Sequence, residues 1–359
     1  MKVYKEINEV PKDIINIWES LDISIEQKPQ WIEACEKLLV SQNRYYFIDY
    51  DENNINYIVV STLVHHLDCL NYISDEELKN EIVNKRKEDE NYFYFNVLFI
   101  SSPMSNCPGI IYNKFSDEQL KNEIIKYCKD MIDIDAIFYC GMLDYEGSME
   151  DKDKEYDLTF PYYPNTVLDL NFSNFDDYLA SLNRKKRWDL KNKQKIFLSK
   201  NCRTVLVDNS KMENYLPLYE LHHSTESKND QYVNYTTYDE KDQFKSYALL
   251  DDKYKWLIAY NENDKIIGFV LLVVDNDIIL FKSVGLDYEY NNTTYTYFNL
   301  YHDAIKYAID NSIRTMYCGT TTYDVKQRLG CKLINRFAAM DIVNKDEFNV
   351  DVQRMNFNG

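Results

Sequence analysis

The chain contains two copies of one helix–strand phrase, about half its length apart. Residues 125–141 read IKYCKDMIDIDAIFYCG, and residues 305–319 read IKYAIDNSIRTMYCG. Each copy has Ile-Lys-Tyr in a helix-like stretch and ends in an apolar, strand-like run that closes on Tyr-Cys-Gly. Internal repeats constrain a fold more than composition does, and this spacing is too long for a solenoid. The repeat therefore predicts a duplicated α/β domain.

A second repeated feature lies upstream of each copy. In both halves two β-type runs flank a polar turn, Asp-Glu-Asn-Asn in the first and Asn-Glu-Asn-Asp in the second, which is typical of a β-hairpin. A further strand follows each hairpin. This order of strands and helices favours an α/β fold in which a mixed sheet is flanked by helices. The expected strands are 45–50, 55–63 and 95–101, then 256–260, 265–274 and 278–284.

The boundary between the halves is expected near Asn165. Residues 144–164 combine a charge cluster with Pro161 and Pro164, a composition typical of a linker. A length of 359 residues is also sufficient for two domains with separate cores. We therefore expect an N-terminal domain over residues 1–164 and a C-terminal domain over residues 165–359.

Composition excludes several classes of protein. The net charge of -18 argues against a general nucleic-acid coat, although it allows one local basic surface. The N-terminal sequence is not that of a signal peptide, and no apolar run is long enough for a membrane span, so a cytoplasmic protein is expected. The eight cysteines are scattered without a Cys-x-x-Cys, which favours reduced core thiols over a metal site.

One dense cationic stretch occurs in this acidic chain. Residues 175–195 read FDDYLASLNRKKRWDLKNKQK, and we interpret about 175–198 as a basic helix, with Trp188 and Leu190 on its apolar side. The stretch could bind the phosphates of a cofactor, a nucleotide sugar or a tRNA acceptor end. It could equally be a solvated helix face that balances nearby acids. The candidate anion-binding residues are Arg184, Lys185 and Arg187.

Three phrases of the second half carry a family resemblance. In order, they are FDDYLASLNRKKRWDLKN, SVGLDYEYNNTTYTYFNLYHDAIKYAI and YCGTTTYDVKQRLGCKL. Together they resemble the tandem-GNAT proteins, which include the Fem-type peptidoglycan peptidyltransferases and related double-domain acetyltransferase-like proteins. The resemblance implies two GNAT-like domains in tandem and transfer of an acyl or aminoacyl group to a small-molecule or peptide amine bound between them. The donor would be acyl-CoA or aminoacyl-tRNA.

The chain departs from typical acetyltransferases at the expected donor site. Those enzymes hold the cofactor pyrophosphate on the main-chain amides of a Gly-rich loop before a helix. The corresponding residues here, 288–297, read YEYNNTTYTY and include no glycine, which makes close backbone approach less easy. Acyl-CoA and tRNA therefore both stay open as donors, as does a non-catalytic ligand-binding module that kept the fold. The candidate anion-binding side chains are Asn291, Asn292, Thr293 and Thr294.

Amine acylation requires a base, stabilisation of the oxyanion and protonation of the leaving group. Fem-type proteins have a lysine before a similar Gly-ending phrase, so the resemblance assigns charge stabilisation to Lys326. Tyr323, one helical turn earlier, could protonate a leaving group. Asp287 and Glu289 follow the strand at 278–284 and are candidate bases, which strand alternation would point to one side. Each residue also has a plainer interpretation: Lys326 as a surface lysine, Tyr323 as a half-buried aromatic, and Asp287 and Glu289 as solvated acids. No metal ligand set is indicated.

The two copies of the repeat differ where chemistry is expected. Gly319 is followed by Thr-Thr-Thr-Tyr-Asp-Val-Lys, whereas Gly141 is followed by Met-Leu-Asp-Tyr-Glu-Gly with no lysine in register. We therefore expect the second domain to be the working half and the first to be the scaffold or acceptor side. The pattern indicates neither the acceptor nor the oligomeric state.

Overall fold

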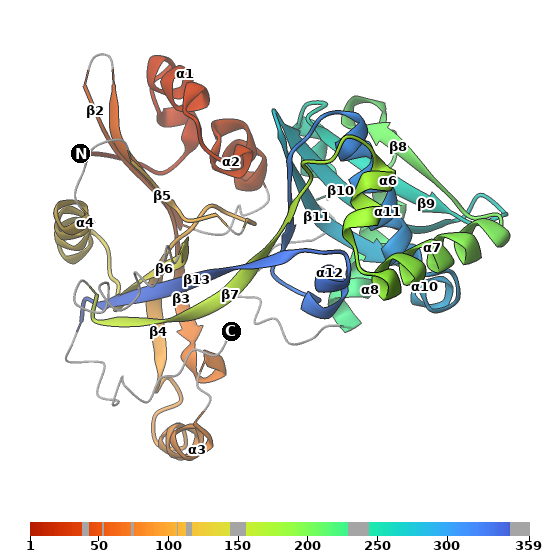
Figure 1. The fold of residues 1–359 in the computed structure, drawn as a ribbon. Helices are drawn as coiled ribbons and strands as arrows, with labels where there is room; N and C mark the ends of the chain where they lie inside the picture. The colour runs from red at the N-terminus through yellow and green to blue at the C-terminus, as the bar shows by residue number, and fades with distance from the viewer. Residues whose placement is uncertain are drawn as a thin grey trace. The chain divides into compact units, whose positions relative to one another are not determined.

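The computed structural model describes residues 1–37, 43–51, 54–72, 75–105, 107–112, 117–143, 156–228 and 244–344. These residues form two compact units (Figure 1). The first comprises the described residues of Met1–Pro164 together with 335–344. The second comprises residues 165–228 and 244–334. Each unit has its own apolar core.

The sheet of the first unit has the order β1-β2-β3-β4-β6-β13, with β5 paired to β3. The pair β4–β6 is parallel and the other pairs of this sheet are antiparallel. The strands are β1 (Lys2–Tyr4), β2 (Asn43–Tyr50), β3 (Ile55–Asp68), β4 (Tyr94–Ile100), β5 (Ile110–Tyr112), β6 (Ala136–Leu143) and β13 (Lys332–Ile342). The α-helices are α1 (Lys12–Ser20), α2 (Pro29–Glu36), α3 (Glu76–Lys85) and α4 (Asp117–Met131).

The sheet of the second unit has the order β7-β12-β11-β10-β9-β8. The pair β11–β12 is parallel and the other pairs are antiparallel. The strands are β7 (Leu158–Asp169), β8 (Arg203–Asp208), β9 (Tyr254–Tyr260), β10 (Ile266–Asp275), β11 (Ile278–Leu286) and β12 (Thr315–Gly319). Residues 158–164 of β7 belong to the first unit and residues 165–169 to the second. The α-helices are α6 (Phe175–Ser181), α7 (Arg184–Ser199), α8 (Leu216–Lys228), α10 (Tyr288–Thr294), α11 (Thr296–Asp310) and α12 (Tyr323–Arg328).

The duplication predicted from the repeat is present in both units. Each sheet has an antiparallel hairpin, β2–β3 or β9–β10, followed by β4 or β11 and then by a helix and a parallel strand. The Ile-Lys-Tyr phrases lie in α4 and α11, and the Tyr-Cys-Gly phrases lie in β6 and β12. Cys140 and Cys318 are both buried at these matching places. The predicted α/β class with two mixed sheets flanked by helices is confirmed.

Two expectations about the chain near the division differ from the structure. Residues 158–164, expected in a linker, lie in β7, whereas residues 144–155 lie outside the described residues. Proline lacks the N–H that a strand uses for pairing, so Pro161 and Pro164 favour a loop in a local interpretation of the sequence. Residues 335–344, expected in the second domain, group with the first unit because β13 pairs with β6. Such a long-range pairing leaves no local signal in the sequence.

No helix in the described ranges is both long and apolar enough to cross a membrane.

Candidate functional site

The parallel strands β11 and β12 pair over a short stretch and then part. Their last paired residues are Leu280 and Tyr317, but β11 continues to Leu286. We call residues 281–286 the β11 overhang. The pairing of the same stretch with β10 contains a bulge between Val270 and Leu271, and bulges bend strands and are frequent next to active sites.

The first unit has no such overhang at the corresponding strand. The last residue of β4, Ile100, still pairs with Tyr139 of β6. The parting of two parallel strands therefore distinguishes the second unit from the first. Ligands of α/β sheets commonly bind where neighbouring strands diverge at their carboxyl ends.

Helix α8 covers part of the overhang. The Nδ1 atom of His222 lies 3.1 Å from the carbonyl oxygen of Val284, and the amide of Leu286 donates to the Oγ1 atom of Thr225 at 3.0 Å. A Cβ atom on Gly285 would lie 2.7 Å from the backbone nitrogen of His222, so only glycine permits this close approach. Side chains of the protein thus satisfy main-chain groups of the overhang that a neighbouring strand does not.

Lys326 lies in α12, the short helix that follows β12. Its side chain is 2% exposed, and burial lowers its pKa from 10.5 to about 8. Within the described part of the chain its ammonium has no hydrogen bond or ion pair. A buried charge without a partner is costly, and it favours an incoming negative group. Of the predicted catalytic residues, Lys326 has the surroundings that charge stabilisation requires.

Two thiols lie next to Lys326. The Sγ atoms of Cys318, near the end of β12, and Cys331, which follows α12, are 3.8 Å apart. The contact with Cys318, and then the charge of Lys326, lower the pKa of Cys331. Burial raises the pKa of Cys318. The predicted role of cysteines as buried core residues holds for Cys318 and Cys331, but these two also shape the electrostatics around Lys326.

Two tyrosines of α11 link the overhang to α12. The ring of Tyr301 stacks on Phe281, the first overhang residue, with centroids 3.7 Å apart. The hydroxyl of Tyr297 lies 3.0 Å from Oγ1 of Thr322, the residue before α12, and 3.4 Å from the Tyr301 hydroxyl. Burial raises the pKa of Tyr297, which keeps the phenol neutral. Sequence reasoning missed Tyr297, whereas Tyr323, which it named, is half-buried on α12 one turn before Lys326.

The candidate bases lie at the start of a helix, not on an extended segment. The Asp287 carboxylate caps α10 by accepting hydrogen bonds from the amides of Glu289 and Tyr290 at 3.1 and 3.4 Å. It also forms an ion pair with Lys265 at 2.8 Å. Glu289 is exposed in the first turn of α10, so strand alternation does not apply to the two acids. Among described residues, neither carboxylate is bonded to Lys326.

The glycine-free segment is also helical, and its side chains are largely used within the protein. Asn291 accepts a hydrogen bond from the amide of Tyr297 at 2.9 Å and thereby caps α11, whose N-terminus was the expected anion site. Thr294 is buried, and its hydroxyl donates to the carbonyl oxygen of Tyr290 at 2.7 Å. The Thr293 hydroxyl makes a similar bond at 3.2 Å. Of the four predicted anion-binding residues, Asn292 and Thr293 are exposed.

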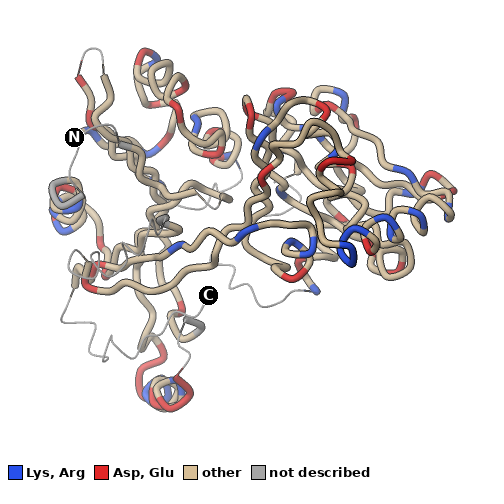
Figure 2. Tube along the Cα trace, in the orientation of Figure 1, with Lys and Arg blue, Asp and Glu red and all other residues tan. Residues whose placement is uncertain are grey.

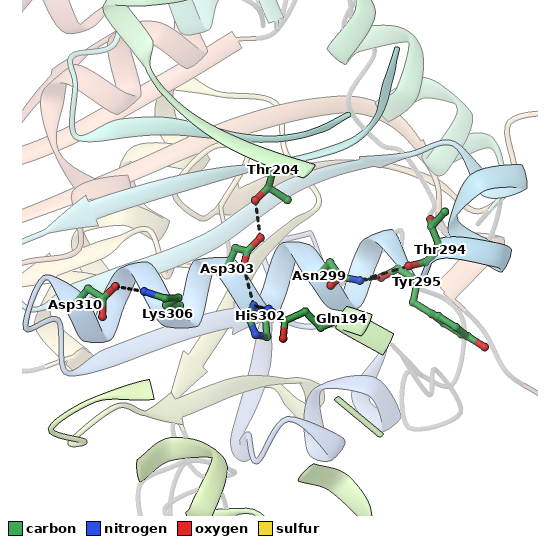
Figure 3. A network of polar contacts seen from close by, with 9 residues as sticks. All are labelled: Gln194, Thr204, Thr294, Tyr295, Asn299, His302, Asp303, Lys306 and Asp310. Atoms are coloured by element: carbon green, nitrogen blue, oxygen red, sulfur yellow. Dashed lines mark hydrogen bonds and ion pairs between the residues drawn. The ribbon is translucent and has the colours of Figure 1, made fainter. Parts of the chain in front are cut away.

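A polar network anchors α11 (Figure 3). The Asp303 carboxylate accepts a hydrogen bond from Thr204 of β8 and lies 2.7 Å from Nδ1 of His302. Gln194 of α7 lies 3.5 Å from the same His302 nitrogen, and Asn299 donates to the carbonyl oxygen of Tyr295 at 2.9 Å. These contacts tie α11 to α7 and β8 and give His302 a structural role.

The predicted basic helix is in fact two helices, α6 and α7. The side chain of Asn183 caps α7 by accepting from the amide of Lys186 at 2.9 Å. The Lys186 ammonium donates to the carbonyl oxygen of Gln327 at 2.6 Å, so the first turn of α7 contacts the end of α12. The expected apolar side is wrong at Trp188, which is 65% exposed, whereas Leu190 is buried.

Cations of α7 remain unpaired next to this contact. Arg184 and Lys185 are exposed and Arg187 is half-buried, and none of the three has an ion pair within the described residues. Figure 2 shows basic residues recurring along α7. The structure therefore brings the predicted anion-binding turn close to the helix that carries Lys326, while Asp287 and Glu289 belong to α10. No group of three potential metal ligands occurs in the described ranges.

Comparison with solved structures identifies the fold. FemX matches 96% of the chain and 98% of its own length with a TM-score of 0.59 at 12% identity. L-PGS from Bacillus licheniformis matches 93% of the chain and 97% of its own, with a TM-score of 0.55 at 10% identity. A tandem GNAT protein from the clavulanic acid biosynthesis pathway matches 95% and 98%, with a TM-score of 0.51 at 7% identity. At such low identity these similarities establish the fold alone, which is that of the tandem-GNAT proteins.

Sequence comparison agrees with this fold. No curated protein matches the chain at a significant level. The model of the FemAB-like family, described as peptidoglycan biosynthesis/recognition, matches residues 92–348. This match includes α7, the β11 overhang and the Lys326 helix, and the chain belongs to the FemAB-like family.

Proposed function

We propose that the protein is an N-acyltransferase that moves an aminoacyl group from aminoacyl-tRNA to the amine of a small-molecule or peptide acceptor in the cytoplasm. The observation that carries this proposal is Lys326, a buried amine without a counter-charge among the described residues. The next residue of its helix, Gln327, accepts a hydrogen bond from Lys186 in the basic first turn of α7. Membership of the FemAB-like family supports the same class of reaction.

The reaction forms an amide and breaks the ester that links the aminoacyl group to the RNA. The acceptor amine attacks the ester carbonyl, and negative charge builds first on the carbonyl oxygen and then on the ribose oxygen. In this proposal the Lys326 ammonium stabilises this charge, because interactions in a water-poor site are strong where charge develops. The amine proton ends on the ribose hydroxyl, and Tyr323 is the proposed donor to that oxygen.

Two features favour RNA over acyl-CoA as the donor. The side chain of Asn291 accepts a hydrogen bond from a main-chain amide at the N-terminus of α11, where a pyrophosphate would otherwise accept hydrogen bonds from such amides. The side chains of His222 and Thr225 on α8 already form hydrogen bonds with main-chain groups of the β11 overhang. The unpaired cations Arg184, Lys185 and Arg187 instead offer a surface for phosphates spread along a strand. Acyl-CoA remains the alternative donor, with Asn292 and Thr293 as its exposed ligands.

A transfer assay tests the proposal. Total tRNA charged with radiolabelled amino acids is incubated with the protein and a mixture of amines and peptides, peptidoglycan precursors included, and label in RNase-resistant product is counted. Label should appear with the wild type and fall at least 100-fold with Lys326→Met, about the loss of one electrostatic stabiliser. Label from radiolabelled acyl-CoA alone would reverse the choice of donor. Product from neither donor would favour a non-catalytic binding module.

A further inference from the structure

One face of α7 combines an exposed aromatic residue with a row of cations. Residues 184, 188, 191 and 195 are spaced i, i+4, i+7 and i+11, which places them on one side of a helix. All four, Arg184, Trp188, Lys191 and Lys195, are exposed. The inward side of the helix is formed by buried residues, among them Leu190 and Phe197. We call the four exposed residues the α7 row.

Trp188 differs from the other tryptophans of the chain. Its side chain is 65% exposed, whereas Trp18, Trp31 and Trp256 are fully buried. Exposing a large aromatic ring to water is unfavourable, since such rings supply much of the burial energy of cores and interfaces. An exposed tryptophan in a row of cations is therefore suited to contact with a partner.

The cations of the α7 row are also available to a partner. Within the described residues, Arg184, Lys191 and Lys195 form no hydrogen bond or ion pair through their side chains. The one acid of the helix, Asp189, is already paired with Lys193 at 2.5 Å. This is a locally cationic surface on a chain of net charge -18, so its partner is expected to be anionic.

The spacing of the row indicates the shape of that anion. Residues 184 to 195 span about 16 Å at 1.5 Å per residue. A compact diphosphate would contact one turn, whereas a nucleic-acid strand presents a series of phosphates that can contact several turns. Proteins that bind single strands combine such cations with aromatic rings on which bases stack. The Lys186–Gln327 contact keeps one end of the row next to α12.

We propose that Trp188 is a stacking platform for an unpaired base of the RNA donor, with Arg184, Lys191 and Lys195 binding the adjacent phosphates. This inference rests on the proposed function for the identity of the donor, but the binding surface itself can be tested without transfer. It also assigns a role to Trp188. Because this side chain is exposed on a folded helix, it can be replaced without harm to the core.

Fluorescence gives a selective measurement, because iodide reaches an exposed tryptophan and not the three buried ones. The probe is an eight-nucleotide single-stranded RNA that is not aminoacylated, and its affinity is measured by anisotropy at fixed salt. Binding should protect Trp188 from iodide. Trp188→Ala should weaken binding about 5- to 150-fold, the range for loss of one stacked base, and Trp188→Phe should retain most of it. Trp188→Lys should also weaken binding, although it adds a positive charge.

Controls separate stacking from charge. Lys191→Ala should lower the slope of log affinity against log salt by about 0.7, whereas Trp188→Phe should leave the slope unchanged. Leu198→Ala removes another exposed apolar residue of α7 and should leave RNA affinity unchanged. Equal affinity of Trp188→Ala and wild type, or tighter binding by Trp188→Lys, would overturn the inference. Protection of Trp188 by CoA or by anionic lipid vesicles, without protection by RNA, would overturn it as well.

The two proposals fail in different ways. If RNA protects Trp188 and Trp188→Ala weakens binding, but no label is transferred from charged tRNA, the proposed stacking platform is supported and the proposed transferase activity is refuted. If charged tRNA is a donor and Trp188→Ala leaves its KM unchanged, the transferase stands and the platform is refuted.

Discussion

Replacing Lys326 by Met should stabilise the protein at neutral pH while it abolishes transfer. Methionine has a similar length and no charge, so the substitution keeps the packing and removes a buried ammonium. The pKa of Lys326 falls from 10.5 to about 8 on folding because of burial. At 1.36 kcal/mol per pKa unit, the charge costs roughly 3 kcal/mol at pH 7. The melting temperature of Lys326→Met should therefore rise by roughly 6 °C or more for a domain of this size.

The increase in stability of Lys326→Met over the wild type depends on pH in a predictable way. Between the folded and unfolded pKa values of Lys326 the unfolded chain binds more protons, so the stability of the wild type rises with pH in this window. The wild type therefore recovers most of the lost free energy as pH rises from about 8 to 10.5. The advantage of Lys326→Met should shrink from about 3 kcal/mol at pH 7 to about 1 kcal/mol at pH 10. Thermal unfolding of both proteins at these two pH values measures the difference.

Lys193→Met is the matched control. Lys193 is also buried in the second unit, but its ammonium is paired with Asp189 at 2.5 Å and lies 3.4 Å from the centre of the Phe298 ring. Removing this charge should destabilise the protein, because Asp189 loses its partner and the ring loses its cation. If Lys326→Met melts at or below the wild-type temperature at pH 7, the ammonium of Lys326 has a counter-charge in the native protein, and the reasoning fails.

Two further predictions concern the chemistry. The rate of transfer, measured as kcat/KM against pH, should fall above about pH 8 as Lys326 loses its proton, and in Lys326→Arg any residual activity should persist to higher pH; an unchanged profile would exclude the proposed role. Asp287→Ala should lower stability by about 1 kcal/mol through loss of the α10 cap, with transfer within about twofold of wild type. A loss of transfer of 100-fold or more in that variant would return Asp287 to the role of base.

Local sequence patterns predicted the elements of this fold because those elements follow from short-range physics. The hairpin at residues 256–274 required only alternation and a polar turn, and the structure has strands over Tyr254–Tyr260 and Ile266–Asp275. The place of β13 could not be predicted in the same way. Its pairing with β6 joins residues almost 200 positions apart, so no window of the sequence contains both strands.

For the candidate site, the sequence identified which residue types to consider but not the local conformation that decides what each one contacts. Lys326 was named from a phrase, and its burial fits the role it was given. Asp287 was named as a base because it follows a strand, yet an aspartate there is also a preferred N-cap, and the structure uses it in that way. Trp188 was assigned to the wrong side of its helix because the break at Asn183 was missed. With α7 beginning at Arg184, the spacing of the exposed residues is visible in the sequence alone.

The two copies differ in how they treat a buried charge, which fits the proposal that the second one carries the chemistry. In the first unit the chain continues beyond Gly141 as strand β6, and the buried Asp341 is neutralised by Lys121 at 2.7 Å. In the second unit β12 ends at Gly319, and the chain turns into a helix that buries Lys326 with no such partner among the described residues. A scaffold gains stability by pairing its buried charges, whereas a site that must bind developing charge needs one left unpaired.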